Sequence, residues 1–117
     1  ESLKLSAYID QVLLYGFNRP HNVALIVAAM PAVEKYAEGL GISGSSESIL
    51  SEPRIRQLFK EQLEHYGKDF KGFEHPHNFA LLSEEWDIDN GLLTPTLKLK
   101  REVVEEQFKT QIDELFS

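Results

Sequence analysis

The stretch "LTPTLKLKR", residues 93–101, gathers side chains that could act on an anion. It places Lys98, Lys100 and Arg101 directly after a Thr94-Pro95-Thr96 step, although the whole chain carries a formal charge of −7. Proline restricts the residue before it to extended conformations, so we expect a stiffened loop here. A lysine on such a loop combines a compact charge with a long flexible stem, which suits delivery of a cation to a phosphate or carboxylate.

The alternative is that these cations are ordinary exposed charges beside a helix that starts at Arg101. Positive charge at a helix N-terminus opposes the helix dipole by roughly a few tenths of a kcal/mol, so the fold alone gains nothing from this placement. This cost counts slightly against the alternative, but the residue types leave both interpretations open, an anionic ligand and ordinary exposed charges. The residue types do not by themselves separate the three cations.

Two other groups of residues could carry chemistry, and each has a simpler explanation. His75 and His77 flank Pro76 and could bind a transition metal, but no carboxylate or cysteine is spaced to complete the site, so we expect a loop and no metal. A cluster of carboxylates lacks the spacing of a calcium loop and predicts a solvated turn. Its members are Glu84, Glu85, Asp87 and Asp89.

Sequence motifs of the common enzyme classes are missing. The chain has no glycine-rich phosphate loop, no His-Glu-x-x-His motif and no nucleophile elbow. It has no cysteine, which excludes disulfides and thiolate metal sites and makes a reducing cytoplasm the natural setting. The acidic surface disfavours nucleic acid as a partner. No apolar run reaches the roughly 18 residues of a transmembrane segment.

Hydrophobic patterning predicts a small α+β domain, with a sheet of about three strands and helices packed on it. Short aliphatic runs predict an antiparallel pair of strands at 11–15 and 22–28, joined by a turn, and a third strand at 78–83. The second run is apolar at nearly every position, which predicts a central strand covered on both faces.

Helices are predicted where apolar residues recur at three- and four-residue steps. These are residues 31–40, a helix after Ser51 as its cap and running to residue 66, and residues 101–116. Residues 43–48, "SGSSES", predict a flexible link and the start of a short turn. Asn90-Gly91 predicts a tight turn that folds "WDI" back toward "LLT".

Four stretches together resemble one protein family. Residues 90–116, "NGLLTPTLKLKREVVEEQFKTQIDELF", resemble the closing segment of long-chain fatty acid CoA ligases, which belong to the AMP-forming adenylate synthetase superfamily. "SAYIDQVLLYG", "NVALIVAAM" and "ALLSEEWDIDNG" resemble further segments of the same family in the same order. The resemblance covers essentially the whole chain.

The resemblance implies that residues 1–117 are the single C-terminal lid domain of a larger two-domain enzyme. The N-terminal domain that binds ATP and the acyl group, and the hinge motif, would lie outside this sequence. It also implies ATP, Mg²⁺ and CoA as cofactor and substrates of the full enzyme, with none held tightly by the fragment. The partner would be the enzyme's own N-terminal adenylation domain, and the location cytoplasmic or peripheral at a membrane.

The family also implies a role for one lysine of the loop. Most relatives read Gly-Lys-hydrophobe where this chain has Leu97-Lys98-Leu99, so the resemblance assigns acyl-adenylate formation to Lys98, with Lys100 as the fallback. Thr94, Thr96, Lys100 and Arg101 become candidate substrate-binding residues, and rotation of the lid would serve thioester formation with CoA. Two alternatives stay open, namely a non-catalytic binding or regulatory module of the same fold and another adenylate-forming synthetase.

Overall fold

A computed structural model describes residues 6–16, 21–67, 76 and 78–116 of the chain. In these ranges three strands form one mixed sheet in the order β1-β2-β3, with β1 at Ile9–Tyr15, β2 at Val23–Ala28 and β3 at Asn78–Leu82. Strand β1 runs antiparallel to β2, whereas β3 runs parallel to it. The predicted α+β class is confirmed, and so is the antiparallel pair. Most of the turn predicted between its strands lies outside the described residues.

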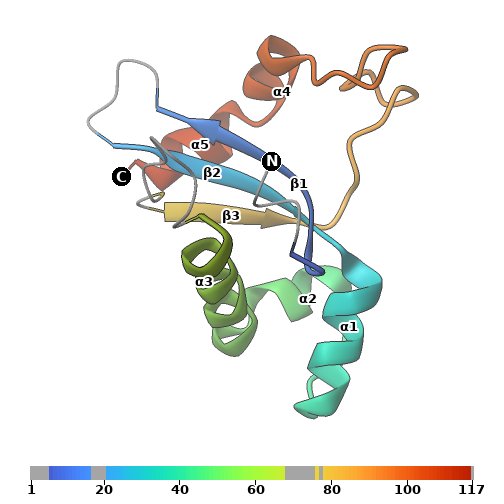
Figure 1. Ribbon diagram of the computed structural model, residues 1–117, viewed down its shortest axis with the longest axis vertical. Coiled ribbons are helices and arrows are strands. Elements are labelled where there is room, and N and C mark those ends of the chain that lie inside the picture. Colours follow the sequence, from blue (N-terminus) through green and yellow to red (C-terminus); the bar gives the residue numbers. More distant parts are fainter. Residues whose placement is uncertain (1–5, 17–20, 68–75, 77, 117) are drawn as a thin grey trace.

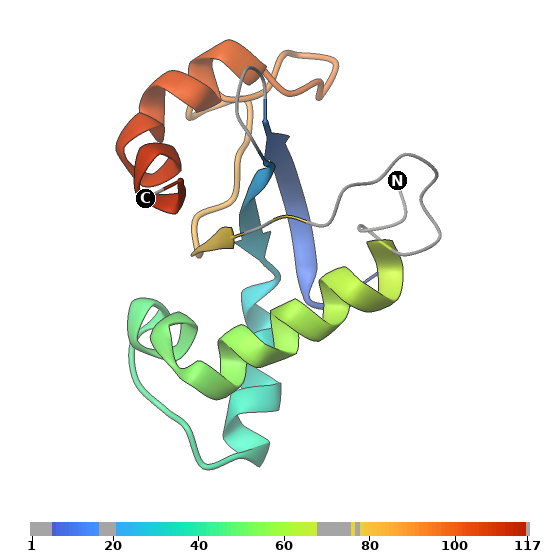
Figure 2. The same cartoon turned by 90° about the vertical axis from the view of Figure 1, so that its left-hand side faces the viewer.

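Strand β2 is the centre of the fold, as its sequence predicts. Each of its six residues is at most 2% exposed. Because successive side chains of a strand point to opposite faces, Ala24, Ile26 and Ala28 enter one apolar cluster and Val23, Leu25 and Val27 enter another. Figures 1 and 2 show the resulting layers, with α1, α2 and α3 on one face of the sheet and α4 and α5 on the other.

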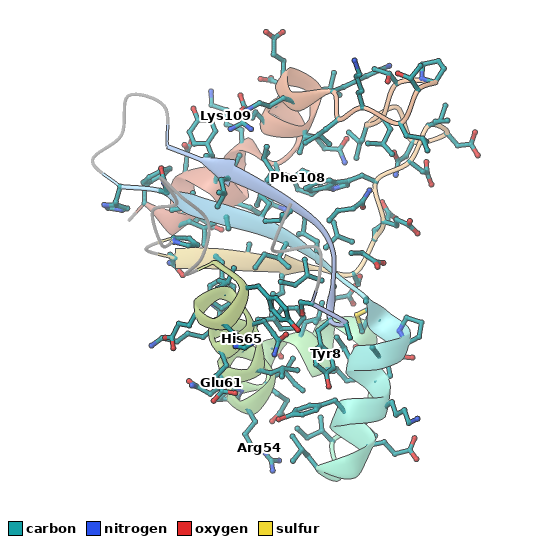
Figure 3. The ribbon with its side chains drawn as sticks, in the orientation of Figure 1. Tyr8, Arg54, Glu61, His65, Phe108 and Lys109 are labelled. Atoms are coloured by element: carbon teal, nitrogen blue, oxygen red, sulfur yellow. The ribbon has the colours of Figure 1, made fainter. Side chains whose placement is uncertain are left out.

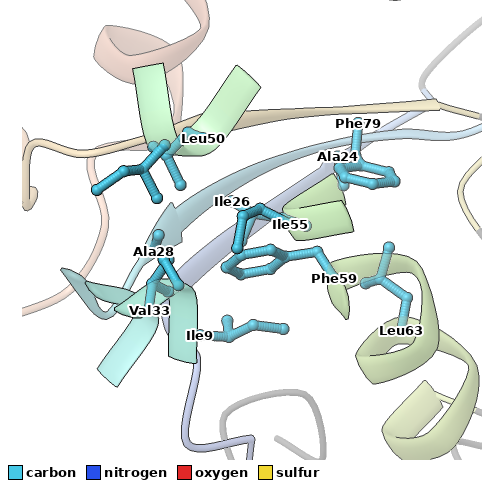
Figure 4. Packing of buried hydrophobic residues seen from close by; sticks show 12 residues of the cluster. Ile9, Ala24, Ile26, Ala28, Val33, Leu50, Ile55, Phe59, Leu63 and Phe79 are labelled. Atoms are coloured by element: carbon cyan, nitrogen blue, oxygen red, sulfur yellow. The ribbon is translucent and has the colours of Figure 1, made fainter. Parts of the chain in front are cut away.

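The first face is covered by α1 at Met30–Gly39, α2 at Ser46–Ser51 and α3 at Pro53–Gly67. Pro31 lies in the first turn of α1, where its missing N–H costs nothing. Helix α3 buries Ile55, Phe59 and Leu63, four residues apart along one stripe, against the sheet. Figure 4 shows Phe59 and Ile55 beside Ile26 in this cluster.

The predictions for residues 43–51 were wrong in one respect. Ser51 does not cap α3 but lies in the last turn of α2, where its hydroxyl donates to the carbonyl of Ser48 at 2.8 Å. The N-cap of α2 is Ser45, whose side chain accepts the N–H of Ser48. Part of the predicted link is therefore helical. Glu52 is extended between the two helices, as the residue before Pro53 must be.

The second face is covered by α4 at Arg101–Gln107 and α5 at Lys109–Leu115. We predicted a single helix over 101–116, but Phe108 separates the two with φ −105° and ψ 20°. The predicted apolar stripe is confirmed, because Val104 and Ile112 are buried against β2 and Phe108 packs in the same cluster. Figure 3 labels Phe108 between this helical layer and the sheet.

Candidate active site

Residues 94–98 form a tight hairpin loop, which we call the lysine turn. The N–H of Leu97 donates to the carbonyl of Thr94 at 2.8 Å, and the N–H of Thr94 donates to the carbonyl of Lys98 at 2.8 Å. Leu93 and Leu99 pair as an isolated antiparallel bridge just outside it. This bonding is that of a three-residue hairpin loop, in which a turn is followed by one residue in the left-handed conformation.

Leu97 is the residue in the left-handed conformation. Its φ is +65°, and every other residue with a positive φ in the described part of the chain is a glycine. The left-handed region costs a residue with a Cβ about 1–2 kcal/mol. The Leu97 side chain is 68% exposed, so packing inside this domain does not offset that cost.

Lys98 has a fixed backbone and a free end. Its N–H donates to the Thr94 hydroxyl at 3.0 Å, while its carbonyl accepts from the Thr94 N–H. Its side chain is exposed, and none of the residues that the structure describes forms an ion pair with its ammonium. The Lys98 charge is therefore exposed, without a counter-ion among the residues whose positions the structure describes.

The two threonines of the lysine turn bond within it. The Thr94 and Thr96 hydroxyl oxygens lie 3.1 Å apart, and Thr94 also accepts from the Lys98 backbone. Thr94 therefore shapes the turn, since one side chain links its two arms. Thr96 is exposed beside it.

Lys100 and Arg101 differ from one another in what holds them. The Lys100 side chain is exposed, and its N–H donates to the carbonyl of Leu92 at 2.9 Å. The Arg101 guanidinium donates to the carbonyl of Leu14 on β1 and pairs with Glu105 at 2.9 Å. Arg101 is thus tied to its own domain, whereas the ammonium groups of Lys98 and Lys100 form no ion pair within the described ranges.

A second turn supports the lysine turn from the preceding segment. The Asp87 carboxylate accepts the N–H of Asn90 at 2.7 Å, and the Asn90 side chain accepts the N–H of Asp87 at 3.0 Å. The Asp87 carbonyl accepts from Leu92 and Leu93. Gly91 has φ +82°, so the predicted Asn-Gly turn is confirmed. No strand forms on either side of it, however; among the described residues of this segment, extended pairing occurs only between Leu93 and Leu99.

The four carboxylates of this segment, Glu84, Glu85, Asp87 and Asp89, are exposed, as expected of a solvated turn. The histidine pair His75 and His77 lies outside the described residues. Within the described ranges, no three ligating side chains come together in a way that could hold a metal ion.

Gln11 is a positioning residue that the sequence reasoning missed. The register of β1 shifts between Ile9 and Gln11, so that Asp10 is an extra residue in the strand. Such a bulge re-aims the side chains that follow it. The Gln11 amide donates to the carbonyl of Trp86 at 2.8 Å and accepts its N–H at 2.7 Å.

These two bonds fasten the start of the loop that leads to the lysine turn. The Trp86 side chain is buried at 2% exposure in the cluster between the sheet and α4 and α5. The available signal was that Asp10 and Gln11 are polar at the start of an otherwise apolar and aromatic strand, but the shift that directs the Gln11 side chain depends on pairing with β2.

None of the helices that the structure describes has the length and apolar character needed to cross a membrane. No family model matches the chain.

Comparison with curated proteins finds several close in sequence. The chain is 34% identical over 112 residues to long-chain fatty acid CoA ligase 1 of Cavia porcellus, a match that covers 93% of this chain and 16% of the relative. The corresponding human ligase is 33% identical over 112 residues, with the same coverage. Long chain acyl-CoA synthetase 8 of Arabidopsis thaliana is 34% identical over 123 residues, covering 99% of this chain and 17% of the relative. The chain thus spans about a sixth of the length of these relatives.

Solved structures show the same fold in adenylation domains. The adenylation domain of a carboxylate reductase from Mycobacterium chelonae superposes with a TM-score of 0.76 at 21% identity, covering 98% of this chain and 16% of that one. The equivalent domain from Segniliparus rugosus, solved with AMP and a co-purified carboxylic acid, gives a TM-score of 0.67 at 20% identity and covers 98% and 17%. By sequence the homologues of this chain are therefore long-chain fatty acid CoA ligases and acyl-CoA synthetases, which it matches over nearly all of its own length.

Proposed function

We propose that residues 1–117 are the C-terminal domain of an ATP-dependent, AMP-forming long-chain fatty acid CoA ligase, and that Lys98 assists formation of the acyl-adenylate. The homology to ligases of that name supports the reaction class. The observation that carries the residue assignment is the geometry of Lys98. Its backbone is fixed by Thr94, while its exposed ammonium has no acidic partner among the described residues.

The first half-reaction explains why a cation is useful there. A fatty acid carboxylate oxygen attacks the α-phosphorus of ATP, a P–O bond forms, and pyrophosphate leaves. Two anions must approach each other, and an ammonium placed between them offsets their repulsion while fixing their geometry. In a closed, poorly hydrated site one such charge is commonly worth about 3–4 kcal/mol, or a few hundredfold in rate.

The remaining parts of the reaction belong to the rest of the enzyme. No set of ligating side chains in the described part of this chain fits Mg²⁺, so we propose that the metal accompanies ATP on the N-terminal domain. We propose that this domain then changes its orientation on that partner so that the CoA thiol can attack the acyl-adenylate and release AMP. The absence of cysteine fits a reducing compartment, for which we propose the cytoplasm.

The test uses full-length enzyme carrying this domain and separates the two half-reactions. Lys98→Ala should lower fatty-acid-dependent pyrophosphate release by at least a few hundredfold. Thioester formation from supplied acyl-adenylate should stay within about threefold of the parent, because that step needs no attack by a carboxylate. Lys100→Ala is the matched control, since it removes another exposed cation two residues away.

Unchanged pyrophosphate release in Lys98→Ala would refute the assignment. If Lys100→Ala lost that activity instead, the role would pass to Lys100.

A further inference from the structure

Leu97 combines two features that do not stabilise the fold. A branched, bulky side chain occupies a backbone conformation that favours glycine, with φ at +65°. The same side chain is 68% exposed, the highest value among the exposed large hydrophobic residues of the described chain. Strained residues persist where the surroundings determine them, and they cluster at sites of function.

The exposed apolar residues near Leu97 give a second observation. Four large hydrophobic side chains are exposed in the described part of the chain, and three of them, Ile88, Leu97 and Val103, fall between residues 88 and 103. This segment carries the lysine turn and lies at one end of the molecule, opposite α1 (Figure 1). The fourth, Tyr36, is on α1 and has the ring of Tyr8 as a partner at 5.7 Å. Exposure of large apolar side chains in the described residues is therefore concentrated in the segment that carries the lysine turn.

We propose that Leu97 is a docking and positioning residue, whose side chain is buried by an apolar surface of the enzyme's N-terminal domain in the orientation that forms the acyl-adenylate. The inference rests on the proposed function. The partner surface must be apolar opposite Leu97 and anionic beside it, because the exposed cations Lys98 and Lys100 adjoin Leu97 with no counter-ion among the described residues. The relatives are about six times longer than this chain, so a partner domain of that kind is available in them.

Because the lysine turn is held by hydrogen bonds, burial of the Leu97 side chain also positions the neighbouring Lys98. Leu97 and Lys98 are consecutive, and both are held to Thr94 by the hydrogen bonds of the loop. Seating Leu97 in the partner surface therefore fixes where the Lys98 stem begins. Small errors in the position of a reacting group cost large factors in rate, so the apolar contact should act through the lysine.

Substitutions at residue 97 in the full-length enzyme separate the side chain from the backbone. Leu97→Gly keeps the left-handed turn and removes the apolar group, and Leu97→Met keeps an apolar group of similar size. We expect kcat/KM for pyrophosphate release to fall about 10- to 100-fold in Leu97→Gly, the value of burying one leucine side chain. In Leu97→Met the same kcat/KM should stay within about threefold of the parent. Thioester formation from supplied acyl-adenylate should change less than about threefold in both.

Tyr36→Ala, which removes an exposed apolar residue at the other end of the domain, is the control and should leave both half-reactions unchanged. The midpoint of urea unfolding, measured for every variant, shows whether each one folds. The proposal is overturned if Leu97→Gly folds and forms adenylate like the parent. It is also overturned if Leu97→Met folds but loses as much activity as Leu97→Gly. Normal activity of Leu97→Gly together with an inactive Lys98→Ala would refute the docking role alone. A fully active Lys98→Ala would instead refute the role proposed for Lys98 in forming the acyl-adenylate.

Discussion

Gln11 and Trp86, 75 positions apart in sequence, are joined by two hydrogen bonds between one side-chain amide and one backbone unit. The pair ties the edge strand β1 to the segment that leads into the lysine turn. The Asp87 carbonyl, one residue further on, accepts from Leu92 and Leu93, and Leu93 pairs with Leu99. A short chain of backbone contacts therefore runs from the sheet to the turn.

Gln11→Ala should lower the free energy of unfolding by about 1–3 kcal/mol, because it leaves the backbone N–H and carbonyl of Trp86 without their partner. Urea unfolding followed by Trp86 fluorescence measures this, since Trp86 is the one tryptophan of the chain. Gln11→Glu is the informative companion, because a carboxylate can still accept the N–H but repels the carbonyl. We expect its loss of stability to match or exceed that of alanine; parent-like stability in both variants would show that the pair contributes nothing.

An arginine side chain donates a hydrogen bond to a backbone carbonyl of each outer strand of the described sheet. Arg101 donates to the Leu14 carbonyl on β1, and Arg56 donates to the Phe79 carbonyl on β3 at 3.1 Å, with its guanidinium 4.3 Å from the Phe79 ring centre. Charged groups at strand edges protect a sheet from pairing with other chains. Arg56→Ala and Arg101→Ala should therefore raise the rate of aggregation on mild heating, measured by light scattering.

Arg54→Ala is the matched control for the edge arginines. Figure 3 shows the Arg54 side chain extending away from the body of the protein. Arg54 is exposed and lies on α3, the same helix as Arg56. Because all three variants change the net charge equally, a difference between them reports on the edge contact. Equal aggregation of the three would contradict the protective role.

Leu97→Gly should leave the isolated domain as stable as the parent or raise its free energy of unfolding by up to about 1.5 kcal/mol. Relief of the left-handed backbone gains about 1–2 kcal/mol, and the more flexible unfolded chain takes back about 0.5–1 kcal/mol. Urea unfolding measures the difference. Gly91→Ala is the opposite experiment, because it adds a Cβ at φ +82°, and should destabilise by about 1 kcal/mol. A clear loss of stability in Leu97→Gly would mean that its side chain packs within the domain.

The isolated 117-residue chain should not bind ATP with micromolar affinity in calorimetry, since its sequence contains no phosphate loop. Tight binding would instead support the alternative of an independent binding or regulatory module. Lys98→Ala in the same titration shows whether any heat comes from the lysine turn.

The sequence by itself determined the elements and much of the core. The unbroken apolar run at 23–28 predicted a central strand because such a run must be covered on both faces, and the stripes of 55–66 and 104–115 predicted which helical faces are buried. It also drew attention to Lys98, since the residue types and the family resemblance both rest on the local stretch around it. These are properties of neighbours along the chain.

Only the tertiary structure decided the features that depend on contacts between distant residues. These include the parallel pairing of β3 with β2, the bulge at Asp10 that directs Gln11 to Trp86, and the contact that ties Arg101 to β1. The left-handed backbone of Leu97 belongs with them, because a sequence that reads leucine predicts the opposite conformation. Periodicity fixes which face of an element is apolar, but strand register and hydrogen bonds across the fold select its partner. That selection fastens Arg101 to β1 and leaves the Lys98 side chain exposed.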